Sequence, residues 1–184
     1  MRPISTSGFT LIEALVVIAL TAILMAFGVP AFQNFTAARA VDSQVAELSG
    51  ALRLARAEAI KRGAPVTVCQ TADPNADPPA CANAADWSSG WLIFVDRGDL
   101  GEFNNGDVLV QARNGFTNSG GMQRATGNAF LTFLPTGVAV ANVAGRFCLR
   151  PPLPVGDPDY LRLTREVVVA STGTTRLGDG VGCP

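Results

Sequence analysis

The most constraining feature of this sequence is an apolar segment near the N-terminus. From Phe9 to Val29 the residues FTLIEALVVIALTAILMAFGV include a single charged side chain, that of Glu13. At ~1.5 Å rise per residue, a helix of this length spans roughly 30 Å, the thickness of the hydrocarbon layer of a bilayer. The segment, residues 9–29, therefore predicts one membrane-spanning helix, and a short polar leader, residues 1–8, precedes it.

Glu13 separates a simple membrane anchor from other interpretations. An acidic side chain inside a spanning helix costs on the order of 2.5–3.5 kcal/mol on the insertion scale, and such a residue usually has a partner. A secretory signal peptide is a further alternative, because Ala38-Arg39-Ala40 matches an A-x-A cleavage pattern and would leave a start at Val41. The apolar part of a signal peptide is shorter, ~7–15 residues, which argues against that alternative.

A second helical pattern follows the apolar segment over residues 30–62. Pro30 lacks a backbone N–H and its ring clashes with the preceding turn, which predicts a kink at that point. Apolar residues then recur at alternating intervals of four and three, the pattern of one buried stripe on a helix. The stripe consists of Val41, Val45, Leu48, Leu52, Ala55 and Ala59.

The same helix has a clear end. Glu58 and Arg62 have the i,i+4 spacing that favours an ion pair on a helix surface. Gly63 and Pro65 follow as stop signals. We therefore expect one long helix from about Phe9 to about Arg62, whose second half packs on a globular domain.

Residues 63–184 change to short β-rich runs separated by Gly, Asn, Asp and Pro, which predicts an antiparallel sheet or sandwich. Asn104-Asn105-Gly106-Asp107 and Pro135-Thr136-Gly137 are turn signals. The expected strands are VTVCQ from Val66, WLIFVD from Trp91, DVLVQ from Asp107, FLTFL from Phe130, RFCLR from Arg146, YLRL from Tyr160 and EVVVAS from Glu166.

Composition weighs against catalysis. The chain has no histidine, the commonest general base and zinc ligand, and its formal net charge is −1. The chain is therefore not expected to be an enzyme, and no cofactor or metal is expected.

An acidic stretch could offer oxygen ligands to calcium, but a solvated hairpin loop is the better interpretation because the EF-hand spacing is absent. This stretch comprises Asp96, Asp99, Glu102, Asn104, Asn105 and Asp107.

Aromatic residues cluster around one expected strand. Trp87 and Trp91, with Phe94 and Phe103, could stack bases or sugars. Indoles beside a strand are more often core residues, and Trp91 and Phe94 need not share a face of the strand. We therefore expect these side chains to pack in the domain.

The residues Gly8-Phe9-Thr10-Leu11-Ile12-Glu13 resemble the processing site of type IV prepilins and type II secretion pseudopilins. The resemblance implies that a prepilin peptidase cuts between Gly8 and Phe9 and that Phe9 becomes an N-methylphenylalanine. It also implies that Glu13 pairs with the terminal amine of a neighbouring subunit. A glycine at the cut allows a protease to approach the backbone closely.

The block from Cys69 to Asp96, ending in DWSSGWLIFVD, is similar to the GspH/FimT branch of minor pilins and pseudopilins. The resemblance implies an α+β, type IV pilin-like fold. In this fold a long N-terminal helix, transmembrane in its first half, packs on an antiparallel β-sheet or β-sandwich. The four cysteines allow three pairings. The resemblance, together with the short loop that it closes, favours Cys69 with Cys81, which leaves Cys148 with Cys183.

Arginines are concentrated near the C-terminus, and guanidinium groups on one face would contact phosphates. In some members of the resembling branch a Gly-Arg-x-Arg element binds DNA during natural transformation. This chain has Gly173-Thr174-Thr175-Arg176, in which threonine replaces the first arginine. Arg176, with Arg162 and Arg165, is the candidate contact to double-stranded DNA. The alternative is that arginines protect an exposed strand edge against aggregation.

The resemblance implies a minor pilin or pseudopilin that primes or caps a type IV pilus or a type II secretion pseudopilus. The alternative is a DNA-binding minor pilin of a DNA-uptake pilus. Implied partners are the prepilin peptidase, other major and minor pilins or pseudopilins, the inner membrane and, for the alternative, DNA. The implied location is the bacterial inner membrane, crossed once with the N-terminus cytoplasmic and residues 63–184 periplasmic, and then the filament.

Overall fold

The computed structural model describes residues 9–82, 84–126, 129–140 and 145–183, apart from the side chain of Pro30. Gly8 and the rest of the leader therefore lie outside the described residues. The chain divides into two compact units, residues 1–36 and 37–184, and each is described by itself.

Helix α1 runs from Leu11 to Arg62 without a break in its helical assignment, through Pro30 and through 38–40. The kink at Pro30 stays a prediction. The helix ends at Arg62, and Gly63 follows it with a φ of +62°, the left-handed conformation that a glycine adopts most readily after a helix. Arg62 pairs with Glu58 as expected, and the hydrogen bond from Arg62 lowers the pKa of the Glu58 carboxyl.

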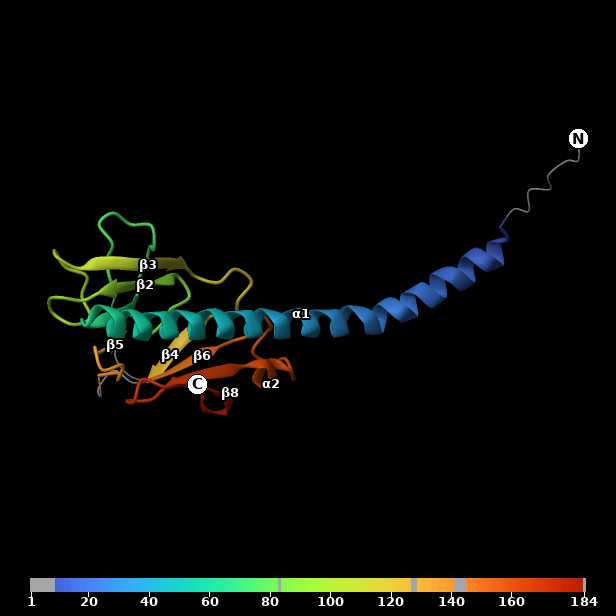
Figure 1. Ribbon diagram of the computed structural model, residues 1–184. Coiled ribbons are helices and arrows are strands. Elements are labelled where there is room, and N and C mark those ends of the chain that lie inside the picture. The colour runs from blue at the N-terminus through green and yellow to red at the C-terminus, as the bar shows by residue number, and fades with distance from the viewer. Residues whose placement is uncertain (1–8, 83, 127–128, 141–144, 184) are drawn as a thin grey trace, which may run out of the picture. The chain divides into compact units, whose positions relative to one another are not determined.

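Residues 37–184 form two antiparallel four-stranded sheets on the second half of α1 (Figure 1). The first sheet has the order β3-β2-β1-β5 and the second β4-β6-β7-β8. The fold class is therefore confirmed. The strands are β1 (Val66–Gln70), β2 (Gly90–Val95), β3 (Val108–Asn114), β4 (Met122–Thr126), β5 (Phe130–Phe133), β6 (Gly145–Leu149), β7 (Arg165–Val169) and β8 (Thr175–Asp179).

One predicted strand is wrong, because YLRL is the short helix α2, Tyr160–Leu163. Tyr160 and Leu163 are both buried while Leu161 is 69% exposed. Buried positions three residues apart share a face of a helical turn, whereas a strand would place Tyr160 and Leu163 on opposite faces. The turn is closed by the Thr164 N–H, which donates to the Tyr160 carbonyl at 3.0 Å.

Two strands, β4 and β8, were not predicted. β4 has the sequence MQRAT, and its second inward-facing residue is Arg124, which the apolar alternation of a strand does not anticipate. β8, TRLGD, has one apolar side chain, Leu177, and it is 64% exposed. Each of these segments is therefore a strand because it pairs with a neighbouring strand, and its own sequence pattern does not indicate a strand.

The core lies between α1 and the inner faces of both sheets. Every residue of the predicted apolar stripe is at most 9% exposed, which confirms the stripe. Phe147 of β6 is fully buried and lies edge-on to Trp87, with ring centroids 4.9 Å apart. The Arg124 guanidinium lies 5.2 Å from the Phe147 ring centre, and burial lowers the pKa of Arg124 to about 10. Arg124 therefore remains a buried cation at neutral pH.

A second, smaller cluster covers the opposite face of the first sheet. Leu92 and Phe94 of β2 belong to it with Cys69, whereas Trp91 and Ile93 belong to the main core. β2 is consequently buried on both faces. Because Trp87 and Trp91 are fully buried, the interpretation of these indoles as core residues is confirmed and they offer no surface for stacking.

Arg56 ties α1 to the turns at one end of the two sheets. Its Nε donates to the Gly137 carbonyl at 2.7 Å and its Nη2 donates to the Thr172 carbonyl at 3.4 Å. Gly137 has a φ of +79°, and a Cβ at this position would lie 2.9 Å from the Ile60 side chain. The predicted turn at 135–137 is thus held against the helix by a guanidinium.

Both disulfides have the favoured pairing. Cys69 is bonded to Cys81, twelve residues apart, and Cys148 is bonded to Cys183, thirty-five residues apart. The first closes the loop after β1, and the second holds the C-terminal residues against β6.

Asp96, at the end of β2, is buried at 1% exposure. Its Oδ2 accepts from the Thr67 hydroxyl at 2.7 Å and from the Gly101 N–H at 2.9 Å. Its Oδ1 has no partner among the described residues. Burial, the largest influence, raises the pKa of the Asp96 carboxyl above its usual 3.8.

This raised pKa gives a testable pH dependence. The folded state holds the Asp96 proton more tightly than the unfolded state, so stability falls as pH rises from near 3.8 through the folded pKa. Asp96→Asn removes this pH-dependent contribution to stability and keeps a side-chain carbonyl that accepts from Thr67 and Gly101. We expect the free energy of unfolding of the wild type, relative to Asp96→Asn, to fall across this window. Urea unfolding at several pH values measures the difference.

Asp99→Asn, a change at an exposed carboxylate in the same loop, is the matched control. A difference between wild type and Asp96→Asn that stays constant with pH would contradict the assignment to Asp96.

Candidate functional site

The apolar segment of the first unit begins with a helix cap. Thr10 precedes α1, and its Oγ1 accepts the Glu13 N–H at 3.3 Å. Thr10-Leu11-Ile12-Glu13 therefore matches the S/T-x-x-E pattern of a helix start, a signal that the sequence interpretation missed. Glu13 lies in the first turn, where the N-terminal end of the helix dipole favours a negative charge.

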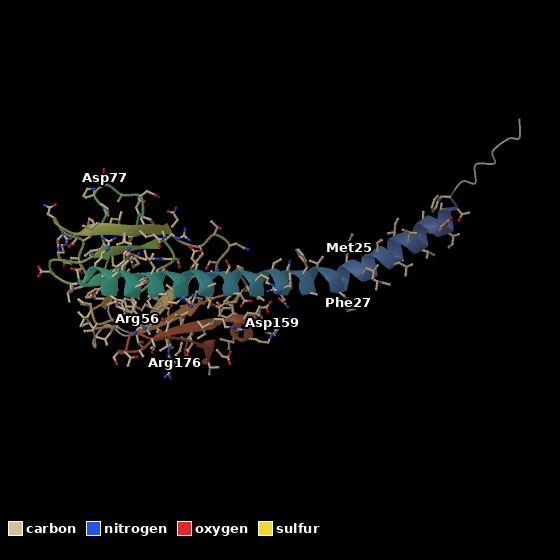
Figure 2. All side chains as sticks on the ribbon, in the orientation of Figure 1. Met25, Phe27, Arg56, Asp77, Asp159 and Arg176 are labelled. Atoms are coloured by element: carbon tan, nitrogen blue, oxygen red, sulfur yellow. A yellow bond between two sulfur atoms is a disulfide. The ribbon has the colours of Figure 1, made fainter. Side chains whose placement is uncertain are left out.

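The side chains of this segment are exposed. Phe9 is 82% exposed and Glu13 is also exposed, and the Glu13 carboxylate has no partner among the described residues. Figure 2 shows side chains projecting on several sides of the helix near Met25 and Phe27. Within the described residues, α1 is the one helix that is long and apolar enough to cross a membrane. An exposed apolar helix of this length requires lipid or other helices around it.

The C-terminal arginines are not gathered on one face. Arg176 on β8 pairs with Val168 on β7, whereas Arg165 pairs with Asp179. Because successive residues of a strand face opposite sides, Arg176 and Arg165 lie on opposite faces of the second sheet. Arg165 lines a groove beside α1, and Figure 2 shows Arg176 on the side away from the helix.

The charges of Arg162, the third candidate, and of the nearby Arg146 are partly neutralised by carboxylates. Arg162 on α2 forms an ion pair with Asp159 at 2.7 Å, which raises the pKa of Arg162. Arg146 shares the outer face with Arg176 and forms an ion pair with Glu166 at 3.1 Å. Arg176 itself is exposed, has no ion pair among the described residues, and stands on an edge strand. Of the three predicted arginines, Arg176 alone offers a free charge on this face.

The acidic stretch forms the connection between β2 and β3. Asp107 accepts the Arg97 N–H at 2.7 Å and the Asn104 N–H at 2.8 Å. Asp96 is buried and bonded as described above. Among the described residues no three acidic, cysteine or histidine side chains are grouped as metal ligands. Asp96 and Asp107 thus accept hydrogen bonds from backbone N–H groups of the connection itself.

A groove of about 830 Å³ runs between α1 and β8 in the second unit. Leu52 and Val45 form its apolar floor, and Leu177 forms part of the opposite wall. The charged residues of its lining are Asp42, Arg53, Arg56, Arg165, Glu166 and Asp179. Sequence reasoning could not find this groove, because β8 was not predicted.

Comparison with known proteins agrees with this architecture. A family model described as the type II transport protein GspH matches residues 44–173. A second model, described as the prokaryotic N-terminal methylation motif, matches residues 5–29, which include Phe9 and Glu13. No protein of curated function matches at a significant level.

Two crystal structures of the type IV minor pilin FimU of Pseudomonas aeruginosa (strain PAO1) have a similar fold. The form in space group P65 is 19% identical with a TM-score of 0.52, over 74% of this chain and 91% of that chain. The form in space group P21 is 18% identical with a TM-score of 0.55, over 78% and 92%. At this identity the likeness concerns the fold.

The GspH model spans more than half of the chain, and the methylation motif occupies the apolar segment that precedes it. Family members are structural pseudopilins and minor pilins rather than enzymes. The chain therefore belongs to the GspH family of type II transport proteins.

Proposed function

We propose that this subunit is stored in the bacterial inner membrane and, after processing, primes or caps a type IV pilus or a type II secretion pseudopilus. The observation that carries the proposal is the coincidence of the methylation motif with an exposed apolar helix that contains one carboxylate. The implied domains are a leader at 1–8, a membrane and filament-core helix at 9–29, its amphipathic continuation at 30–62, and an exported domain at 63–184.

Processing creates the partner that Glu13 lacks. Cleavage by the prepilin peptidase between Gly8 and Phe9 exposes an amine on Phe9, which is then methylated and stays cationic. In an apolar bundle a carboxylate and an ammonium that meet offset part of each other's desolvation cost. The Glu13 carboxylate of one subunit pairs with the Phe9 amine of a neighbour and sets its axial position.

The apolar segment changes surroundings at little cost when it leaves the membrane. Lipid tails and a bundle of apolar helices have similar polarity, so packing and specific polar contacts decide association. In the proposed orientation in the membrane, the N-terminus is cytoplasmic before cleavage and the β-rich domain, residues 63–184, is periplasmic. The partners are other pilins or pseudopilins of the same filament.

The test is Glu13→Ala in a cell that contains the native assembly system. We expect processing and membrane insertion to continue and incorporation into the filament fraction to be lost, because the neighbour's amine has no partner. Immunoblots of membrane and sheared filament fractions measure both. Glu102→Ala, which removes an exposed carboxylate of the globular unit, is the matched control.

Normal incorporation of Glu13→Ala would refute the assembly role of this carboxylate. A wild-type chain that never enters the filament fraction would refute the proposed function itself.

The alternative of a DNA-binding minor pilin rests on Arg176, the free arginine on the outer face of the second sheet. A phosphate contact through this residue would weaken with salt and disappear in Arg176→Ala. Electrophoretic binding of double-stranded DNA across a salt series, wild type beside Arg176→Ala, separates this alternative from a purely structural subunit.

A further inference from the structure

The outer edge of β8 is open. Two backbone hydrogen bonds mark the two ends of the pairing between β7 and β8. The Ala170 N–H donates to the Thr174 carbonyl, and the Gly180 N–H donates to the Thr164 carbonyl. In an antiparallel ladder alternate residues direct their backbone groups to the same neighbour. The N–H and C=O groups of 175, 177 and 179 therefore point away from β7, and no backbone partner for them exists among the described residues.

β3, an edge strand of the first sheet, is protected against further pairing, whereas β8 is not. The pairing of β3 with β2 shifts register between Ile93 and Phe94, an irregularity that discourages further pairing. Arg113 of β3 also forms an ion pair with Glu47 of α1 at 2.6 Å. β8 pairs with β7 in regular register, and no ion pair or hydrogen bond joins it to α1 within the described residues.

The groove beside this edge has a charge at each end. Arg56 contacts the turn before β8, so Arg53, one turn earlier in α1, lies near the start of the strand. Asp42 and Asp179 lie toward the other end, where Arg165 of β7, the register partner of Asp179, also lines the groove. Arg53, Asp42 and Asp179 are exposed and have no partner among the described residues. An extended backbone that satisfies the edge would therefore meet two guanidinium groups, Arg53 and Arg56, at one end, and two carboxylates with one guanidinium at the other.

We propose that this groove receives an extended segment of the adjacent pilin or pseudopilin subunit, which adds a strand to β8. The inference rests on the proposed function. The open backbone groups require an extended chain. The groove fits a segment with an acidic side chain near Arg53, small apolar side chains over Leu52, and a basic side chain near Asp42 and Asp179.

The occupant is a different part of the neighbour rather than its own β8. Subunits that leave one membrane in one orientation are added by a screw operation, which generates heterologous contacts. Two β8 edges facing each other would instead need a two-fold axis. The groove thus forms one half of a contact that repeats along the filament.

Photo-cross-linking of the full chain in assembling cells tests this contact. p-Benzoylphenylalanine replaces Leu177, 64% exposed on β8, or, as the matched control, Leu161, 69% exposed on α2. We expect position 177 to cross-link at least fivefold more than 161 to an extended segment of a subunit that carries an N-terminal methylation motif. Mass spectrometry of the cross-linked peptide identifies the segment.

A backbone variant gives the second arm. Leu177→Pro removes an N–H that faces the open edge and leaves the ladder with β7 in place, since proline is accepted in edge strands. Leu177→Ala keeps the N–H. We expect Leu177→Pro to lose most of its incorporation into the filament and Leu177→Ala to keep it, with processing unchanged in both.

The proposal is overturned, with the proposed function intact, if the wild type assembles but position 177 cross-links no more than position 161. Cross-links from position 177 that reach only lipid or the helix of a neighbouring subunit would overturn it as well. Incorporation of a folded Leu177→Pro at the wild-type level would also overturn it. If Leu177→Pro fails to fold, as judged by its thermal transition, the cross-linking arm decides alone. A wild type that does not assemble would instead contradict the proposed function.

Discussion

Phe147→Ala is expected to lower the free energy of unfolding by about 3–5 kcal/mol, the usual cost of deleting a buried ring. Phe147 is fully buried at the centre of the second sheet, edge-on to Trp87 and beneath the Arg124 guanidinium. The deletion leaves a cavity and also removes the aromatic face that accompanies a buried cation, so relaxation of the neighbours cannot recover the loss.

Urea unfolding of the full chain in detergent micelles, followed by tryptophan fluorescence, measures this effect because Trp87 reports on the same cluster. Leu161→Ala removes an exposed side chain and should change stability by no more than about 0.5 kcal/mol. A loss below about 1 kcal/mol for Phe147→Ala would show that the ring is not part of a tightly packed core.

Loss of the Cys148–Cys183 disulfide is expected to cost about 3–4 kcal/mol. The bond closes a loop of thirty-five residues, and the chain-entropy model assigns a stabilisation of this size to a loop of this length. The bond also holds the C-terminal residues on the outer face of the second sheet, where the Gly182 carbonyl accepts from Arg146 at 2.9 Å.

The double variant Cys148→Ala/Cys183→Ala, unfolded in urea beside the wild type, measures this cost. Cys69→Ala/Cys81→Ala is the comparison, and its twelve-residue separation predicts a smaller loss of about 3 kcal/mol. If the longer loop proves no more costly than the shorter one, or costs less than 1 kcal/mol, loop closure is not the source of the stabilisation.

The sequence could predict those features that depend on local pattern. The apolar stripe of α1 has a strict helical period, and its residues are buried as expected. The processing motif is contiguous, and the strands with alternating or continuous apolar residues, such as β2 and β7, were found. Each of these signals is complete within a few neighbouring residues.

The features that escaped depend on distant partners. Arg124 faces inward on β4 because the Phe147 ring and the carbonyls of Thr126 and Phe130 receive its guanidinium, and the contact with Phe147 depends on strand pairing that the local sequence does not show. β8 is a strand because β7 lies beside it. The faces of Arg165 and Arg176 likewise follow from strand register, which composition cannot give, so a basic C-terminal region did not become a basic surface.

The position of α1 between the two sheets has a consequence for biosynthesis. The apolar stripe ends at Ala59, but Val167 and Val169, which belong to the same core, are synthesised much later. At ~5–20 residues per second the interval lasts roughly 5–20 s. Until those strands are synthesised, the stripe lacks part of the core that covers it in the folded unit. A holding chaperone that shields this helix would act before any filament contact is possible, and yield in the cell would depend on it.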